Sequence, residues 1–256
     1  FLVGNARWRG ARLKDVLEKA GVSAEAKQVS FNGMDTPPAP QVPDFIKTLE
    51  MDHAMNGEVL LAYSMNGEDL PLLNGYPLRL VVPGVQGVSW VKYLRRLEVG
   101  DQPYGTKDET IHYIDLMPGG LHRQYTSTQE CKSVVTTPSG GQVLLDKGYY
   151  QISGLAWSGR GKVKRVDVTT DGGRNWRTAR LQDPVMSKCL TRFTLDWQWD
   201  GKPAIIQSRA MDETGYVQPT YQQLRAVRGT RSIYHNNAIQ SWLVQESGEV
   251  KNVQLS

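Results

Sequence analysis

Apolar positions near the start of the chain recur at helical spacing. Leu13, Val16, Leu17 and Ala20 follow one another at intervals of three and four residues or are adjacent. This spacing predicts an amphipathic helix, and Gly21 stands where a helix C-cap is expected. The chain enters this helix within its first dozen residues, so we expect a further segment to precede it in the complete protein.

Short apolar runs after this helix predict strands separated by turns. Residues 29–31, 58–63 and 78–82 have the β-branched and apolar content of buried strands, and Asn66-Gly67 predicts a hairpin turn. Four prolines within residues 36–43 are incompatible with a central strand there. The first part of the chain is therefore predicted to mix helix and strand.

The pattern changes near residue 130, where short strands begin to alternate with glycine-bearing turns. The sequence Asp171-Gly172-Gly173 is the clearest of these turns. Strands at this spacing, without intervening helices, predict an antiparallel β-sandwich. We therefore predict an α+β protein of two domains, residues 1–127 and 128–256, which agrees with a length of 256 residues.

Composition narrows the function without defining it. Hydrophobic residues make up 39% and charged residues 22%, which favours a folded core, and no apolar run approaches the roughly 18 residues that span a bilayer. The formal charge of +4 is explained most simply by solubility, and it also suits an anionic ligand or a soluble redox partner. We expect neither a membrane nor a nucleic-acid partner, because no basic stripe with interleaved aromatic residues is present.

Common catalytic motifs are missing from the sequence. Two cysteines are too few for a disulfide scaffold, and neither they nor the four histidines form a metal-ligand pattern. No nucleophile elbow and no phosphate-binding P-loop occurs. We therefore predict no metal ligand from this chain.

Two cations stand beside glycine-bearing turns. Arg79 follows the turn at Asn74-Gly75, and Lys92 comes soon after the turn at Pro83-Gly84. Backbone N–H groups freed by such turns, together with a guanidinium and an ammonium group, can bind a phosphate. By chemistry alone a surface loop is the simpler interpretation, and an anion site is the alternative.

Several segments resemble the sulfite oxidase family of molybdenum enzymes. The core signature of that family is similar to residues 65–71 (MNGEDLP), 75–79 (GYPLR), 82–84 (VPG) and 91–92 (VK). Further similar segments are residues 6–17, 31–35 and 166–176. The resemblance implies a sulfite-oxidase-type molybdopterin domain, incomplete at its N-terminus, followed by an immunoglobulin-like dimerisation domain.

Within that family, other stretches are similar to the molybdenum subunit of sulfane dehydrogenases. They are residues 115–118, 132–141, 154–161 and 232–237. This resemblance implies a periplasmic enzyme of thiosulfate oxidation that forms a homodimer. It also implies oxidation of a reduced sulfur compound, held on a sulfur-carrier protein or present as a small oxyanion, with electrons passed to a cytochrome c.

The resemblance assigns cofactor-binding roles to four residues. Arg79 and Lys92 would hold the pterin phosphate of the molybdenum-molybdopterin cofactor, and Asp35 would contact the pterin. Asn74 stands where many relatives have a histidine, so it can form hydrogen bonds but cannot titrate. A guanidinium fork together with an ammonium group suits a dianionic phosphate.

The resemblance also implies catalytic residues. Tyr113 falls where the family places a phenol near the molybdenum, and the alternative is an ordinary packed tyrosine. Arg225 and Arg228 compete for the basic position that reaches the substrate, and we prefer Arg228 because Gly229 follows it. Tyr234 and His235 either line the same cleft or belong to a structural network.

One expected group is missing. The family binds molybdenum through a cysteine upstream of the residues that match Arg7-Trp8, and neither Cys131 nor Cys189 matches it. We expect this chain to be part of a complete enzyme that supplies the thiolate. Two alternatives are a sulfite dehydrogenase of the same family and a cofactor-free binding or dimerisation module.

Overall fold

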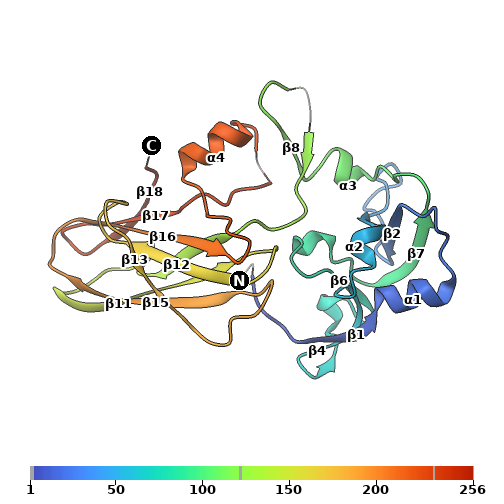
Figure 1. Ribbon diagram of the computed structural model, residues 1–256, viewed down its shortest axis with the longest axis horizontal. Coiled ribbons are helices and arrows are strands. Elements are labelled where there is room, and N and C mark those ends of the chain that lie inside the picture. Colours follow the sequence, from blue (N-terminus) through green and yellow to red (C-terminus); the bar gives the residue numbers. More distant parts are fainter. Residues whose placement is uncertain (1–2, 121–122, 233, 256) are drawn as a thin grey trace. The chain divides into compact units, whose positions relative to one another are not determined.

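The chain forms two compact units (Figure 1). The computed structural model describes residues 3–120, 123–232 and 234–255. Unit 1 contains the chain up to Ile114 together with Arg123–Ser127, whereas the segment that begins at Asp115 and the chain from Thr128 onward belong to unit 2. The short strands β8 (Ile114–Leu116) and β9 (Arg123–Tyr125) lie where the chain passes from one unit to the other.

Unit 1 mixes strands with short helices. One sheet has the order β1-β4-β5 with β6 also paired to β4, and the other has the order β3-β2-β7. The strands are β1 (Trp8–Arg12), β2 (Gln28–Gly33), β3 (Ile46–Glu50), β4 (Leu60–Met65), β5 (Glu68–Asp69), β6 (Arg79–Val81) and β7 (Leu94–Gly100). The helices are α1 (Leu13–Ala20), α2 (Met51–Ala54) and α3 (Lys107–Thr110), with 3-10 turns η1 (Leu72–Asn74) and η2 (Gly87–Ser89).

The local predictions for unit 1 are confirmed in most respects. Helix α1 contains the predicted apolar positions and ends at Gly21, which adopts the left-handed conformation with φ of 76°. The expectation that the chain enters this helix within its first dozen residues is wrong, because Trp8–Arg12 forms strand β1 and the helix begins at Leu13. Leu13 and Leu17 are buried, but Val16 faces solvent, so the apolar face is narrower than the sequence suggests. The predicted loop at residues 36–43 contains no strand.

A compact apolar core supports unit 1. It contains residues of α1, of both sheets and of the chain after β6. The loops of the candidate site, described below, connect these packed elements. Its buried members are Leu13, Leu17, Val29, Phe31, Leu49, Ala54, Val59, Leu61, Leu80, Val82, Val85, Val91 and Leu94. Burial of this apolar surface provides the main favourable free energy for folding the unit.

Unit 2 is an antiparallel sandwich of two sheets. A four-stranded sheet has the order β10-β11-β15-β14, and a five-stranded sheet has the order β13-β12-β16-β17-β18. One core contains residues from both sheets, including Phe193 and Ile206. The strands are β10 (Lys132–Thr137), β11 (Gly148–Trp157), β12 (Val163–Thr169), β13 (Arg177–Thr178), β14 (Arg180–Leu181), β15 (Thr191–Trp199), β16 (Ala204–Asp212), β17 (Ser241–Val244) and β18 (Val250–Val253). This arrangement agrees with the predicted immunoglobulin-like domain.

The expectation of strands without intervening helices is wrong at one place. Helix α4 (Tyr221–Arg228) lies between β16 and β17. Thr220 caps it, because its hydroxyl accepts from the backbone N–H of Gln223 and the Gln223 side chain accepts from the backbone N–H of Thr220. This reciprocal capping box fixes the start of a polar helix whose apolar periodicity is weak.

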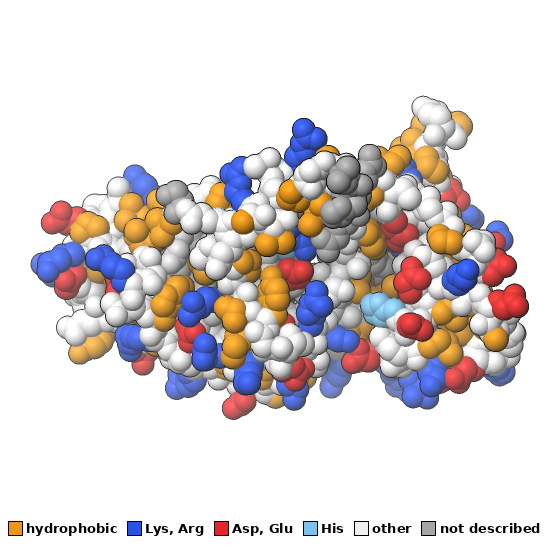
Figure 2. Space-filling view, turned by 45° about the horizontal axis from the view of Figure 1, so that its top comes forward, with side chains coloured by type: hydrophobic (Ala, Val, Ile, Leu, Met, Phe, Trp, Pro, Cys, Tyr) orange, Lys and Arg blue, Asp and Glu red, His pale blue; other side chains and the backbone are white. Residues whose placement is uncertain are grey.

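The surface carries charges of both signs. Basic and acidic side chains are interspersed on the face drawn in Figure 2. In the described part of the chain, no helix is long and apolar enough to cross a membrane.

Candidate functional site

Three loops of unit 1 meet around Lys92. We call these loops, residues 33–35, 73–77 and 90–93, the cation cradle. The backbone N–H of Met34 donates to the carbonyl of Tyr93 at 2.9 Å. A Cβ atom on Gly75 would lie 2.9 Å from the Cβ of Lys92, and one on Gly33 would lie 2.6 Å from the carbonyl oxygen of Lys92. Glycine at both positions therefore allows the three loops to approach one another.

Arg79 begins strand β6 and extends its guanidinium under the cradle. Its Nη1 donates to the carbonyl of Asn74 at 2.9 Å, and its Nη2 donates to the carbonyl of Trp90 at 3.1 Å. The Cζ atom lies 5.1 Å from the ring centre of Trp8 and 5.8 Å from that of Trp90. The two aromatic rings and the two carbonyls hold the cation in one orientation.

The charge of Arg79 is not neutralised by a carboxylate. Among the residues that the structure describes, no acidic side chain lies within ion-pair distance of Arg79 or of Lys92. Burial lowers the pKa of Arg79, but a guanidinium remains protonated at neutral pH. A buried cation held by carbonyls and aromatic rings, without a carboxylate, keeps a positive potential for an anion.

The other predicted cofactor residues surround this cation. Lys92 is exposed, and its ammonium group donates to the carbonyl of Leu73 at 3.1 Å. Asn74 contributes its backbone carbonyl to Arg79, which is a role that the side-chain argument did not foresee. The exposed Asp35 follows the cradle glycine Gly33, and its Oδ2 lies 3.2 Å from the Cβ position of that glycine. The structure thus brings Asp35, Asn74, Arg79 and Lys92 together.

Tyr113 is packed against a buried lysine elsewhere in unit 1. Lys47 is fully buried, and its Nζ lies 4.5 Å from the ring centre of Tyr113 and 5.6 Å from that of Tyr125. The same Nζ donates to the carbonyl of Asp108 at 3.1 Å. Burial lowers the pKa of Lys47, and the nearby carboxylates of Glu109 and Asp108 oppose this effect. The sequence did not single out Lys47, because one lysine in an edge strand has no distinctive pattern.

Arg228, the other predicted catalytic residue, lies in unit 2 and has two acidic partners. It ends helix α4 and is buried. Its Nη1 lies 3.3 Å from Oδ2 of Asp115, and its Nη2 lies 3.1 Å from Oε1 of Glu130. Arg225, the competing arginine, is exposed and donates to the hydroxyl of Tyr221 at 2.9 Å. The charge of Arg228 is therefore compensated, in contrast to that of Arg79.

Glu130 connects Arg228 to further polar groups. The Nε2 atom of His235 lies 3.3 Å from Glu130 Oε2, and Tyr216 donates its hydroxyl to the same oxygen at 2.9 Å. These hydrogen bonds, that of His235 first, lower the pKa of Glu130 to about 2, and the charge of Arg228 contributes. Ser232 donates to Asp115 at 2.6 Å. We call Asp115, Glu130, Arg228, Ser232 and His235 the arginine network.

Neither cysteine has the properties of a metal-binding thiolate. Cys131 is fully buried, and burial raises the pKa of its thiol to about 12. Cys189 is half-buried, and burial raises its pKa as well. Both lie in unit 2, and the described residues contain no group of three or more metal-ligating side chains. The residues of unit 1 thus fit a phosphate-bearing pterin, but the cysteines of this chain do not fit the molybdenum.

Two family models match most of the chain. Residues 1–107 match the oxidoreductase molybdopterin binding domain, and residues 123–242 match the Mo-co oxidoreductase dimerisation domain. The structure of the sulfane dehydrogenase SoxCD from Paracoccus pantotrophus is 46% identical, covers 97% of this chain and 62% of its own, and superimposes with a TM-score of 0.91.

Curated relatives are similar over much of the chain. The mitochondrial sulfite oxidase of Homo sapiens is 38% identical over 85% of this chain and 43% of its own length, and that of Mus musculus is 35% identical over 85% and 42%. A nitrate reductase of Hordeum vulgare is 33% identical over 75% of this chain and 24% of its own. The chain thus spans less than half the length of these relatives. Together with both domain matches, these similarities show that the chain belongs to the sulfite oxidase family of molybdopterin oxidoreductases.

Proposed function

We propose that this protein takes part in the molybdopterin-dependent oxidation of a reduced sulfur compound, with sulfane sulfur on a carrier protein as the substrate. The observation that carries this proposal is the cation cradle, where a buried guanidinium without a carboxylate partner lies beside Lys92. The 46% identity to SoxCD over nearly the whole chain supports the choice of sulfane sulfur.

The residues of unit 1 would bind the organic part of the cofactor. Arg79 and Lys92 would hold the pterin phosphate, and Asp35 would accept hydrogen bonds from the pterin ring. When bound, the molybdenum cofactor supplies oxygen transfer to sulfur and accepts the two electrons that the sulfur atom loses. The role of this chain would be to bind and orient the cofactor.

Tyr113 and Arg228 are the residues that we propose for the substrate. Tyr113 would donate a hydrogen bond from its phenol, and Arg228 would attract an anionic sulfur group. Because Asp115 and Glu130 compensate the charge of Arg228, its role would be directional hydrogen bonding more than long-range attraction. Arg228→Lys keeps the charge but loses the fork, so it should raise KM more than it lowers kcat.

The partners follow from the same proposal. A cytochrome c would accept electrons one at a time, and the periplasm would be the location. The match of residues 123–242 to a dimerisation domain supports a homodimer formed through unit 2. A sulfur-carrier protein would present the substrate as a persulfide.

A substrate assay tests the proposal. The cofactor-loaded protein is mixed with a protein-bound persulfide or with sulfite, and the reduction of cytochrome c is followed by haem absorbance. We expect the persulfide to be oxidised with a kcat/KM at least about tenfold above that of sulfite, because 1.4 kcal/mol of differential transition-state binding suffices for such a preference. Equal or higher activity with sulfite would contradict the choice of substrate.

Sulfite is the second candidate substrate, and a specific observation favours it. The sulfite oxidases of mouse and human are 35% and 38% identical to this chain. A preference for sulfite in the same assay would support this alternative. A cofactor-free dimerisation module remains a third candidate, because both cysteines lie in unit 2. Absence of pterin after expression in a cofactor-producing host would support that candidate.

A further inference from the structure

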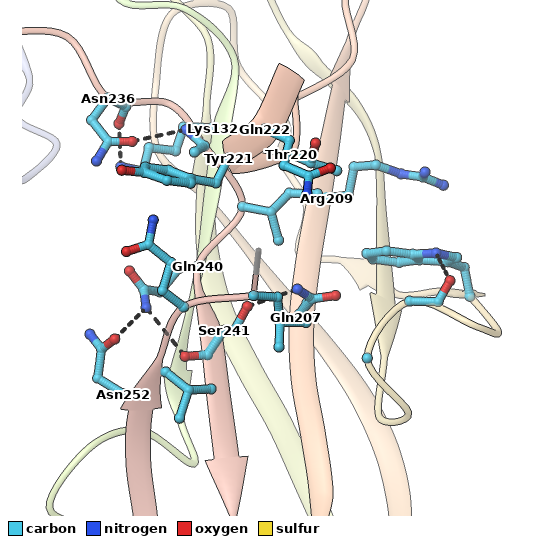
Figure 3. A pocket seen from close by; sticks show the side chains of 18 residues that line it. Lys132, Gln207, Arg209, Thr220, Tyr221, Gln222, Asn236, Gln240, Ser241 and Asn252 are labelled. Atoms are coloured by element: carbon cyan, nitrogen blue, oxygen red, sulfur yellow. Dashed lines mark hydrogen bonds between the residues drawn. The ribbon is translucent and has the colours of Figure 1, made fainter. Parts of the chain in front are cut away.

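Unit 2 contains a pocket that belongs neither to the cation cradle nor to the arginine network (Figure 3). Its volume is about 640 Å³, which lies within the range of about 300–1,000 Å³ that is typical of small-molecule sites. The start of β10, the turn before β13, strand β16, the start of α4 and the end of β18 line it. All of these elements belong to unit 2.

Most of the side chains that line the pocket are polar, and the charged ones are all positive. Among the described residues, Lys132 and Arg209 are its two cationic members, and no aspartate or glutamate lines it. The neutral hydrogen-bonding side chains are Gln207, Thr220, Tyr221, Gln222, Asn236, Gln240, Ser241, Asn252 and Gln254. A pocket of this composition favours an anionic, polar occupant.

Lys132 has no carboxylate partner in the described part of the chain. Its side chain is half-buried, and its ammonium group donates to the backbone carbonyl of Asn236. Burial lowers the pKa of Lys132, and no nearby acid opposes this effect. A desolvated ammonium group with one carbonyl partner is stabilised further when an anion approaches it.

Arg209 adds positive potential on another wall of the pocket. Its guanidinium lies 4.4 Å from the ring centre of Trp176 and 3.4 Å from Asp167. The same carboxylate also pairs with Arg165 at 3.2 Å. Asp167 is thus shared by two guanidinium groups, of which Arg209 is the one that lines the pocket.

The amide side chains are held in place by their own hydrogen bonds. Gln240 donates to the side-chain oxygen of Asn252 at 3.1 Å, and Gln207 donates to the hydroxyl of Ser241 at 2.8 Å. The side-chain oxygen of Asn236 accepts from the backbone N–H of Ala238 at 3.1 Å. Because the oxygens of Asn236 and Asn252 already accept, these amides offer N–H donors to a ligand.

We propose that this pocket binds a small polar molecule that carries an oxyanion, such as a carboxylate, sulfate or phosphate group. The oxyanion contacts the ammonium group of Lys132, and the amides of Asn236 and Asn252 donate to it or to adjacent polar atoms. The pocket is much larger than one inorganic anion, so the natural ligand extends beyond its charged group. This proposal does not depend on the proposed function, because it uses no residue of the cradle or of the arginine network.

Calorimetric titration of the 256-residue protein tests the proposal. The probes are sulfate, phosphate and citrate, each compared with sodium chloride at equal ionic strength. We expect saturable binding of at least one of the three oxyanions, with citrate the tightest because it is the largest. Lys132→Gln keeps a donor for the carbonyl of Asn236 and should weaken this binding about tenfold, since a charged hydrogen bond is lost.

A neighbouring lysine provides the matched control. Lys251 lies in β18 beside Asn252 but does not line the pocket, so Lys251→Gln removes the same net charge and should leave the affinity unchanged. Asn252→Asp is a second test variant, because it preserves the acceptor for Gln240 and places a negative charge at the pocket. It should weaken oxyanion binding at least as much as Lys132→Gln.

Three results would overturn the proposal. They are no saturable binding of any oxyanion probe, equal weakening by Lys251→Gln, and undiminished binding in both Lys132→Gln and Asn252→Asp. Sedimentation of the same variants tests a further explanation, in which the pocket contacts a second copy of the chain. If Lys132→Gln alters self-association and no oxyanion binds, the pocket contacts a second copy of the chain, and the small-ligand proposal is wrong.

Discussion

The two units bury an arginine in opposite ways. Arg79 in unit 1 is 8% exposed and Arg228 in unit 2 is 7% exposed, so their burial is nearly equal. Arg79 donates to the carbonyls of Asn74 and Trp90, whereas Arg228 pairs with the carboxylates of Asp115 and Glu130. Equal burial therefore does not determine whether the charge of an arginine is compensated or available to a ligand.

The difference lies in the charge that remains for a ligand. Carbonyl dipoles stabilise a guanidinium without cancelling its charge, so the cradle keeps a positive potential. Asp115 and Glu130 carry two negative charges against the one of Arg228, and Arg160, whose guanidinium lies 3.7 Å from Glu130, supplies a second cation. Arg79 suits the binding of an anionic cofactor, whereas Arg228 holds its network together and can act on a substrate only through directed hydrogen bonds.

Removal of Arg228 should have the largest effect on stability. Arg228→Met leaves Asp115 and Glu130 buried without their cation, and the loss of one partner from a buried ion pair costs about 3–5 kcal/mol. Chemical denaturation with urea measures this loss in the free energy of unfolding. Arg225→Met on the exposed face of the same helix is the control and should change stability by less than about 1 kcal/mol. Similar losses in both variants would contradict the network.

Acid should weaken unit 2 through Glu130. The pKa of Glu130 is about 2 in the folded protein and lies below that of an unfolded glutamate, about 4.3. Its contribution to stability is therefore present above pH of about 4.3 and is lost as the pH falls toward 2. Denaturation midpoints of the wild type and of Glu130→Gln should converge over that interval. A constant difference between them would contradict the assigned pKa.

Removal of Arg79 should cost less stability than removal of Arg228. Arg79→Met leaves the carbonyls of Asn74 and Trp90 without a donor, and each unsatisfied group costs about 1–3 kcal/mol when water cannot reach it. The half-buried position of Asn74 lets water compensate in part, so we expect each carbonyl to cost near the lower end of this range and the total loss to be about 2 kcal/mol. If urea denaturation shows a larger loss than for Arg228→Met, the contrast between the two arginines is wrong.

Lys92 should affect stability least. It is exposed and donates to one carbonyl, so Lys92→Gln should change the free energy of unfolding by less than about 0.5 kcal/mol. The same variant should nevertheless retain less pterin than the wild type, because it removes one of two cations from the cradle. Lys19→Gln in helix α1 is the matched surface control. Equal pterin retention in the two variants would show that Lys92 does not contribute to pterin binding.

Local sequence signals indicated the cradle only as the alternative to a surface loop, and the family resemblance assigned its residues. The arginine network had no local signal at all. Gly75, Arg79 and Lys92 lie within 18 positions of one another, so their turns and cations are visible in one stretch of sequence. Glu130 and Arg228 are separated by 98 positions, and only the sandwich fold brings them together. No local pattern indicates such a pair. The same reason explains why Lys47, whose ammonium group lies over Tyr113, was missed.

One feature that was not predicted, helix α4, has a recognisable signal in the sequence. Helix α4 was not predicted because its sequence is polar, but Thr220 and Gln223 have the spacing of a capping box. Trp8 lay within a segment that resembled the family, yet its contact with Arg79 depends on the pairing of β1 with β4 and of β4 with β6. By contrast, the apolar face and the end of α1 were predicted, because its apolar spacing and its terminal glycine agree. Its start was not, because strand β1 occupies Trp8–Arg12.

Pterin retention tests the central claim most directly. The chain, Arg79→Gln and the surface control Arg96→Gln are expressed in a host that makes molybdopterin, and bound pterin is measured by fluorescence after oxidation. Wild type and Arg96→Gln should retain pterin equally, and Arg79→Gln should retain about tenfold less while remaining folded by circular dichroism, since a charged hydrogen bond to phosphate is lost. Absence of pterin from the wild type, or equal retention in folded Arg79→Gln, would contradict the account.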